Sequence, residues 1–264
     1  MLKEKKQRRP RKMIIANWKM NPMTEKEAKD ILNVLKRKII KIFGAETFVC
    51  PPALYFATLK KSYSGKKISF GLQDVFYEER GSYTGEISVE QAKDFGAKLV
   101  IVGHSERRAL GETNDIVSKK LKAVLKNNIK AVLCVGERER DEHGEYLLFL
   151  REEIRASLSG IQKSMIDNLI IAYEPIWAIG KNYKMSISAR ELEEVIIFIK
   201  KVLSEIYGKD EVQMVPIIYG GSVEEKNAEE LAGVPLVDGF LVGHESLKPN
   251  SFITIALALS SRKK

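Results

Sequence analysis

The sequence is poor in the residues that disulfide and metal chemistry require. Its 264 residues include two cysteines and three histidines. Cys50 and Cys134 each lie inside a short apolar run, so we expect buried free thiols in a reducing compartment rather than a disulfide. The three histidines, His104, His143 and His244, show no metal-ligand spacing among themselves or with cysteine. We therefore expect no metal site.

Long hydrophobic runs are also missing. No apolar run approaches the roughly 20 residues that a membrane-spanning helix needs, and the basic start of the chain is not followed by an apolar core long enough for a signal peptide. Apolar residues make up 44% of the chain and charged residues 30%, as in ordinary soluble globular proteins. The sequence thus predicts a cytoplasmic protein without a membrane partner.

Positive charge is concentrated at the start of the chain. The formal net charge is +9, and residues 1–12 account for +6 of it, which leaves +3 for the remainder. An arm of this kind can bind nucleic acid or another anionic surface, but this one has no aromatic residues to stack on bases. We therefore expect residues 1–12 to be a disordered, solvated extension that does not bind nucleic acid, and residues 13–264 to be the folded domain.

Eight short apolar segments alternate with amphipathic helical patterns after the extension. The segments predicted as strands are 13–16, 47–50, 68–73, 99–103, 131–135, 169–172, 215–218 and 239–242. The first helical pattern follows Thr24, which has Glu27 three residues later and so predicts a capping box. Alternation of this kind is typical of a parallel sheet with crossover helices.

Eight such units in about 250 residues fit a closed (β/α)₈ barrel, an α/β fold of the TIM-barrel type in a single domain. An open, doubly wound sheet is the alternative. That fold usually places a glycine-rich phosphate-binding turn after the first strand, whereas this chain has Asn17-Trp18-Lys19 there. We therefore expect the barrel.

Polar residues follow the ends of the predicted strands. In a parallel barrel these ends all face one rim. Each residue alone has an ordinary explanation as a turn, core or solvated residue, but their gathering on one rim predicts an active site. They are Asn17, Lys19, Gln73, His104, Ser105, Glu106, Glu174, Gly220, Gly221, Ser222, Gly243 and His244.

The chemistry that this rim suggests is proton transfer. Glu174 precedes Pro175, which ends the strand, and an apolar loop containing Trp177 follows, as suits a lid that excludes water. Desolvation disfavours a charged carboxylate, so Glu174 would be a stronger base there. A helical turn starting at His104 would favour the neutral imidazole, which can still donate a hydrogen bond to an oxyanion. Lys19 offers a positive charge for an oxyanion or a phosphate.

Four blocks of the sequence resemble the signature blocks of the triosephosphate isomerase family. They are NWKMN at 17–21, GHSERR at 103–108, AYEPIWAIG at 172–180 and YGGSV at 219–223, and the resemblance runs from about residue 13 to the last helix. It implies a glycolytic and gluconeogenic enzyme that interconverts dihydroxyacetone phosphate and D-glyceraldehyde 3-phosphate through an enediolate, without metal or cofactor.

The resemblance also implies the family's established role for each matching residue. Glu174 would be the general base, His104 the neutral electrophile, and Lys19 with Asn17 would stabilise charge and position the substrate, under a lid over residues 175–185. The remaining implied residues are Gly180, Ser222, Gly243 and the backbone of His244 for the phosphate, Glu106 as a supporting partner, and Thr84 in a loop that enters a neighbouring subunit of a homodimer or higher oligomer.

Three stretches depart from the family pattern. His244 stands where the family has a second glycine, the lid continues through Lys181-Asn182-Tyr183-Lys184-Met185, and residues 10–12 join a basic arm that is not part of the shared barrel pattern. A backbone N–H survives at His244 unless the position needs a positive φ, and Asn182 tolerates left-handed geometry. The alternative function is therefore a phosphate-binding barrel whose turnover is impaired by the altered lid and His244. A barrel isomerase for a larger phosphosugar is a further rival, which the short lid disfavours.

Overall fold

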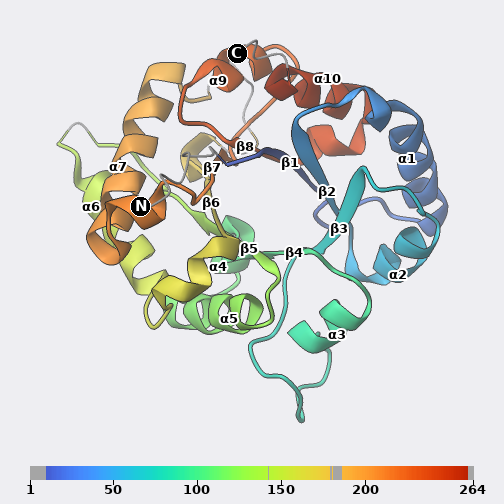
Figure 1. Cartoon of the computed structure of the whole chain (residues 1–264), viewed down its shortest axis with the longest axis horizontal. Coiled ribbons are helices and arrows are strands. Elements are labelled where there is room, and N and C mark those ends of the chain that lie inside the picture. The colour runs from blue at the N-terminus through green and yellow to red at the C-terminus, as the bar shows by residue number, and fades with distance from the viewer. Residues whose placement is uncertain (1–9, 142, 179, 181–185, 261–264) are drawn as a thin grey trace, which may run out of the picture.

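The computed structural model describes residues 10–141, 143–178, 180 and 186–260. Its strands form a closed parallel barrel in sequence order, with β8 paired back to β1. Figure 1 shows the strands at the centre and the helices around them. The predicted (β/α)₈ fold is confirmed, and the open sheet is excluded. The strands are β1 (Lys12–Asn17), β2 (Ala45–Cys50), β3 (Ile68–Leu72), β4 (Leu99–Val102), β5 (Lys130–Val135), β6 (Leu169–Tyr173), β7 (Ile217–Tyr219) and β8 (Gly239–Val242).

Helices connect the strands on the outside of the barrel, and several begin where the sequence places a cap. Thr24 and Glu27 form the predicted capping box of the first helix, and Ser188 and Glu191 form another. The helices are α1 (Glu25–Lys38), α2 (Ala53–Lys61), α3 (Val89–Asp94), α4 (Ser105–Ala109), α5 (Asn114–Lys126), α6 (Glu145–Ser157), α7 (Ala189–Tyr207), α8 (Lys209–Val212), α9 (Ala228–Gly233) and α10 (Pro249–Ser260), with the 3₁₀ turns η1 (Ile39–Lys41), η2 (Lys163–Asn168), η3 (Ile176–Ala178) and η5 (His244–Leu247).

The strands are mostly apolar, with polar residues chiefly near their ends, because both of their faces are buried. In β1, Ile14 and Ala16 belong to the large core between strands and helices, whereas Met13 and Ile15 belong to a second cluster inside the barrel. The alternation follows from the period of two along a strand. The predicted start of the seventh strand was wrong: β7 begins at Ile217, because proline at 216 has no N–H to donate to the ladder.

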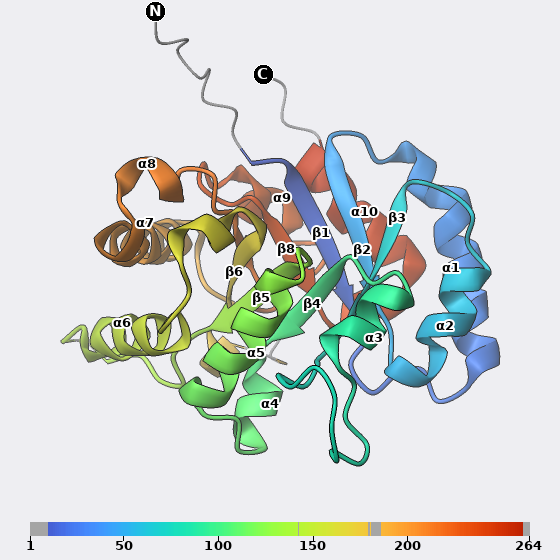
Figure 2. The same ribbon diagram turned by 60° about the horizontal axis from the view of Figure 1, so that its bottom comes forward.

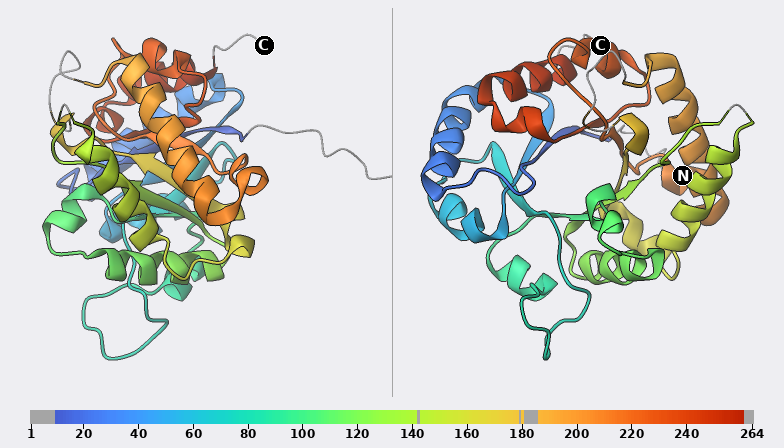
Figure 3. Two further views of the ribbon diagram at one scale, coloured as in Figure 1. Left: turned by 90° about the vertical axis from the view of Figure 1, so that its left-hand side faces the viewer. Right: turned by 180° about the vertical axis from the view of Figure 1, so that it is seen from behind.

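The two ends of the barrel differ in what they carry. Figure 2 shows the connection from α1 to β2 at the upper edge and α4, which follows the carboxyl end of β4, at the lower edge. The connection between β3 and α3, residues 73–88, projects well beyond the ring of helices in every view (Figure 3). No helix in the described part of the chain is long and apolar enough to cross a membrane. The division at residue 12 stays a prediction, and residues 1–9 lie outside the described part.

Both cysteines are free and completely buried inside the barrel, as predicted. Burial raises the pKa of the Cys50 thiol, and burial together with the Glu174 carboxylate raises that of Cys134. We expect neither thiol of the native protein to react with a thiol reagent at pH 8, and both to react in guanidinium chloride. Rapid labelling of either cysteine in the native protein would contradict this packing.

Candidate active site

A cavity of about 400 Å³ opens at the carboxyl ends of the strands. It brings together nearly all of the residues that the sequence predicts for catalysis and substrate binding. Glu174 is the exception, because it does not line the cavity itself. The lining residues are Asn17, Lys19, His104, Glu106, Gly180, Gly220, Gly221, Ser222, Val223, Glu224, Leu241, Gly243, His244 and Glu245.

Lys19 is held at the cavity by hydrogen bonds to its backbone. Its φ of 54° is left-handed, a conformation that non-glycine residues rarely adopt. The Lys19 N–H donates to Asn17 Oδ1 at 3.0 Å, and Gln73 Nε2 donates to the Lys19 carbonyl at 2.8 Å and to the Cys50 carbonyl at 2.9 Å. Gln73 therefore does not line the cavity as a rim residue; it holds Lys19 in place. Lys19 Nζ lies 2.6 Å from Glu106 Oε1.

His104 is the N-cap of α4, as the predicted helical turn requires. Its Nδ1 accepts the N–H of Glu106 at 3.2 Å. A ring nitrogen that accepts from the backbone carries no proton, so the proton of the neutral ring is assigned to Nε2. The Glu106 carboxylate lies 3.7 Å from Nδ1 and would favour a proton there, but its side chain is 55% exposed and its other oxygen is bound to Lys19. The closer backbone contact therefore decides the tautomer.

Glu174 follows β6 directly and is 1% exposed. Its Oε2 accepts the Ser105 N–H at 3.1 Å, and its Oε1 lies 3.3 Å from His104 Nε2. That second contact is close but not aligned as a hydrogen bond, so among the described residues Oε1 is buried without a partner. A buried acceptor without a donor is costly. The carboxylate sits beside His104, next to the cavity but not among the residues that line it.

Comparison with known proteins decides what kind of barrel this is. The sequence profile of the triosephosphate isomerase family matches residues 12–259. A triosephosphate isomerase of Dehalococcoides mccartyi is 44% identical over 96% of this chain and all of that protein, and one of Moorella thermoacetica is 42% identical over 94% and 98%. The chain belongs to the triosephosphate isomerase family. The predicted family, and with it the prediction of an enzyme of the isomerase class, is confirmed.

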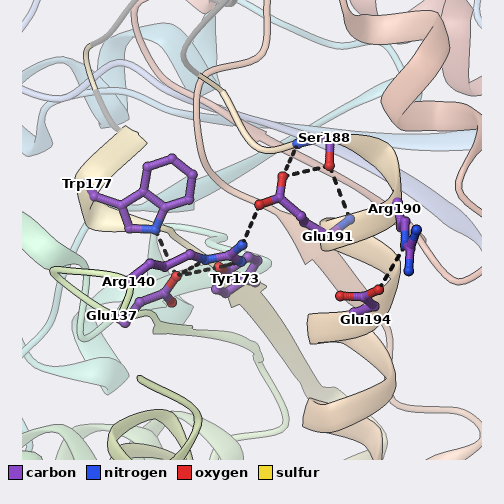
Figure 4. A network of polar contacts seen from close by, with 8 residues as sticks. All are labelled: Glu137, Arg140, Tyr173, Trp177, Ser188, Arg190, Glu191 and Glu194. Atoms are coloured by element: carbon purple, nitrogen blue, oxygen red, sulfur yellow. Dashed lines mark hydrogen bonds and ion pairs between the residues drawn. The ribbon is translucent and has the colours of Figure 1, made fainter. Parts of the chain in front are cut away.

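The apolar loop after Glu174, a lid segment in the triosephosphate isomerase family, is anchored on a buried carboxylate. Oε1 of Glu137 accepts hydrogen bonds from Trp177 Nε1 at 2.8 Å, the Tyr173 hydroxyl at 2.8 Å and Arg140 Nε at 3.1 Å (Figure 4). Arg140 also donates to Glu191 at 2.9 Å, at the start of α7. Glu137 thus contacts the start of this loop directly and the start of α7 through Arg140. The predicted tolerance of left-handed backbone geometry at Asn182 stays a prediction, because residues 181–185 lie outside the described part of the chain.

The hydrogen bond from Trp177 can be tested by replacing it with phenylalanine. If this loop acts as the family's lid, we expect Trp177→Phe to change kcat or KM by roughly three- to tenfold, because one net hydrogen bond of about 1 kcal/mol that anchors the loop is lost. Steady-state kinetics measures this change. Tyr173→Phe is the matched control, since it removes a donor to the same oxygen from strand β6. It should lower stability while leaving kcat and KM within about twofold; equal kinetic effects of the two variants would contradict a role specific to the lid.

The departure at His244 from the triosephosphate isomerase pattern causes no backbone strain. The non-glycine residues with positive φ in the described part of the chain are Lys19 and Asn128, so His244 does not need glycine's freedom. The neighbouring Gly243 has little room for a side chain, because a Cβ there would lie 3.2 Å from Lys19 Cε. The altered position thus keeps a backbone N–H beside the cavity.

Three features of this site are absent from the predictions made from the sequence. They are the hydrogen bond from Gln73 to the Lys19 carbonyl, the hydrogen bond from Trp177 to Glu137, and the position of Glu174 outside the cavity lining. Tyr173 lies inside a recognisable block, but Glu137 is 36 residues away from it in sequence. No local spacing signals such a contact, because Glu137 is the first of a run of charged residues, 137–142, that follows Gly136. Thr84 is exposed in the projecting connection and is not among the residues that line the cavity.

Proposed function

We propose that this chain is a triosephosphate isomerase, which interconverts dihydroxyacetone phosphate and D-glyceraldehyde 3-phosphate by proton transfer. The observation that carries the proposal is the approach of Glu174 to within 3.3 Å of His104 Nε2, next to a cavity that also holds Lys19. A base, a hydrogen-bond donor and a cation on three different strands of the barrel are what enolisation of a phosphorylated ketone needs.

Glu174 rotates from the Ser105 N–H into the cavity and takes a proton from C1 of dihydroxyacetone phosphate. The electron pair of the C–H bond forms the C1–C2 double bond, and the carbonyl oxygen on C2 becomes an oxyanion. His104 donates its Nε2 proton to that oxygen and recovers a proton from the hydroxyl on C1, while Lys19 stabilises the negative charge. Glu174 then returns its proton to C2. Only protons move, so the reaction is expected to need neither metal nor cofactor.

The phosphate group is proposed to lie between Lys19 and the loops after β7 and β8. Ser222, Gly243 and His244 line the cavity there, Gly180 lines it from the loop after β6, and loops at the ends of β7 and β8 commonly bind phosphate in this fold. Ser222 donates its hydroxyl to the Ala178 carbonyl at 2.8 Å, which joins this loop to the base of the lid. Asn17, at the end of β1, accepts the backbone N–H of Lys19, and Glu106 pairs with Lys19 Nζ until a substrate binds.

The coupled assay is the first test. Purified chain and glyceraldehyde 3-phosphate are combined with a dehydrogenase that consumes dihydroxyacetone phosphate, and we expect robust turnover. An absence of turnover, with sulfate still bound in the cavity, would favour the alternative of a phosphate-binding barrel with impaired catalysis. Turnover of a larger phosphosugar in preference to the triose would favour the other rival.

The effect of His244 on phosphate binding can be tested by comparing its substitution with one at the neighbouring Gly243. We expect His244→Gly to change KM by less than about twofold, since the backbone N–H is already free of strain. Gly243→Ala should raise KM by about tenfold, or ~1.4 kcal/mol, because the added methyl group crowds Lys19. KM values from the coupled assay measure both. A several-fold lower KM in His244→Gly would show that the histidine hinders phosphate binding.

The assembly is proposed to be a homodimer or higher oligomer in the cytoplasm, with a role in glycolysis and gluconeogenesis. The projecting connection that carries Thr84 supports this, because it exposes Tyr83 to 45% and encloses little core of its own. A hollow of about 340 Å³, lined by residues 76–91 of the same region, lies beside it. Analytical ultracentrifugation tests the proposal, and a monomer at micromolar concentration would contradict it.

A further inference from the structure

The positive charge of the chain is concentrated more strongly than the N-terminal extension alone explains. Residues 36–67 contain eight lysines and arginines and one acidic residue, Glu46, so their net charge is +7. Residues 1–12 add +6, and the chain as a whole has +9, which leaves −4 for all other residues. An asymmetry of this size creates a positive potential over one part of the surface.

Residues 36–43 and 60–67, here called the basic face, form one continuous surface. Lys36 at the end of α1 donates to the carbonyl of Ser62, just after α2, at 2.6 Å. Lys67, just before β3, donates to the carbonyl of Ile42 at 3.2 Å. These connections precede the amino ends of β2 and β3, so the basic face lies at the opposite end of the barrel from the active-site cavity (Figure 2).

The charges of the basic face are not paired with carboxylates in the described part of the fold. None of its lysines and arginines forms an ion pair with another described residue, whereas Glu46 is shared by Arg11 at 3.9 Å and Lys130 at 3.7 Å. Basic residues in the last turns of α1 and α2 suit the helix dipoles. The dipoles do not explain Lys41, or the exposed pair Lys66 and Lys67, which lie outside those helices.

Two large apolar side chains stand exposed among these charges. Ile40 is 62% exposed and Phe43 is 69% exposed. Lys67 Nζ lies 4.7 Å from the centre of the Phe43 ring, so one face of that ring is occupied and less available to stack on a nucleic-acid base. Exposed apolar side chains surrounded by lysines are the pattern of surfaces that dock on anionic lipid headgroups.

We propose that the basic face binds the surface of an anionic phospholipid bilayer, with Ile40 and Phe43 entering the headgroup layer. The lysines and arginines supply the attraction, and the two apolar residues supply contact with the acyl boundary. The sequence predicted no membrane partner because it lacks a membrane-spanning segment. Peripheral binding to the surface of a bilayer does not require such a segment. The cavity at the other end of the barrel stays open, so the docked protein retains its turnover.

Sedimentation with vesicles tests the proposal on the full chain. Binding is expected to vesicles that contain phosphatidylserine, to weaken steeply with added salt, and to be absent with phosphatidylcholine alone. The triple variant Lys41→Glu, Lys61→Glu, Lys66→Glu should weaken binding by about tenfold or more. The matched control, Lys126→Glu, Lys201→Glu, Lys209→Glu, makes the same charge change at exposed lysines of α5, α7 and α8 and should weaken it by less than about threefold.

Two further measurements test the contribution of the apolar side chains to vesicle binding and distinguish a bilayer from a nucleic acid as the partner. Ile40→Ser with Phe43→Ser keeps the net charge and should still lower vesicle binding severalfold. Equal losses in the two triple variants, or no loss in the serine variant, would overturn the proposal. So would binding to single-stranded RNA with no binding to vesicles, or vesicle binding that disappears only when residues 1–9 are removed. Turnover in the coupled assay should be unchanged in all of these variants, which keeps the outcome independent of the enzymatic function.

Discussion

Glu174→Gln is expected to lower kcat by about 10³-fold while changing the midpoint of thermal unfolding by no more than a few degrees. The amide cannot accept the proton from C1, and general-base catalysis of this kind contributes roughly 10²- to 10⁴-fold. Glutamine keeps the shape of the side chain, and its amide oxygen can still accept the Ser105 N–H that Glu174 accepts at 3.1 Å. Steady-state kinetics in the coupled assay measures the loss, and thermal unfolding checks the fold.

The chain offers a matched control for this substitution in Glu153→Gln. Glu153 is also buried and accepts the Gly136 N–H at 2.8 Å, but it lies outside the cavity and next to Arg108. Its replacement should destabilise the protein by about 1–3 kcal/mol and change kcat by less than about threefold. Near wild-type turnover in Glu174→Gln would show that another group is the base.

Lys19→Met is expected to lower kcat/KM by about 10³-fold, because it removes the one lysine or arginine among the described residues that line the cavity. Loss of a charged partner for a buried anion typically costs ~2–5 kcal/mol. Methionine keeps most of the length of the side chain, and the left-handed backbone at residue 19 stays held by Asn17 and Gln73. The coupled assay gives kcat/KM, and competition by sulfate reports on binding separately.

Glu106→Gln is the control for the charge of Lys19. It removes the carboxylate that lies 2.6 Å from Lys19 Nζ but leaves the lysine in place. If Lys19 binds the anionic substrate, sulfate should compete as well or better in this variant, whereas it should compete poorly in Lys19→Met. Weaker sulfate binding in Glu106→Gln than in Lys19→Met would contradict this account of the cation.

The fold could be predicted because its signals are local and repeated. Each strand is a run of apolar residues that ends at a polar residue or a turn, and caps such as Thr24 with Glu27 mark where helices begin. Eight repeats leave few arrangements open, and the parallel barrel then places every strand end on one rim. The gathering of His104 and Lys19 at the cavity followed from that topology alone.

The details that the sequence did not predict depend on contacts between distant segments. Glu137 and Trp177 are 40 residues apart, and Gln73 and Lys19 are 54 apart. A side chain such as Glu174 also has several rotamers, and the contact with Ser105 decides which one is occupied. The basic face was likewise missed, because its charges become neighbours only when the ends of α1 and α2 pack together.

We propose that catalysis proceeds by proton transfer through an enediolate, with Glu174 as the base. Proton NMR of the conversion of dihydroxyacetone phosphate in D₂O tests it most directly, because a carboxylate that has taken the substrate proton can exchange it with solvent. We expect triose phosphate products that carry deuterium on the carbon that received the proton, with both conversion and exchange lost in Glu174→Gln. Conversion without any deuterium incorporation, or exchange that persists in Glu174→Gln, would contradict it.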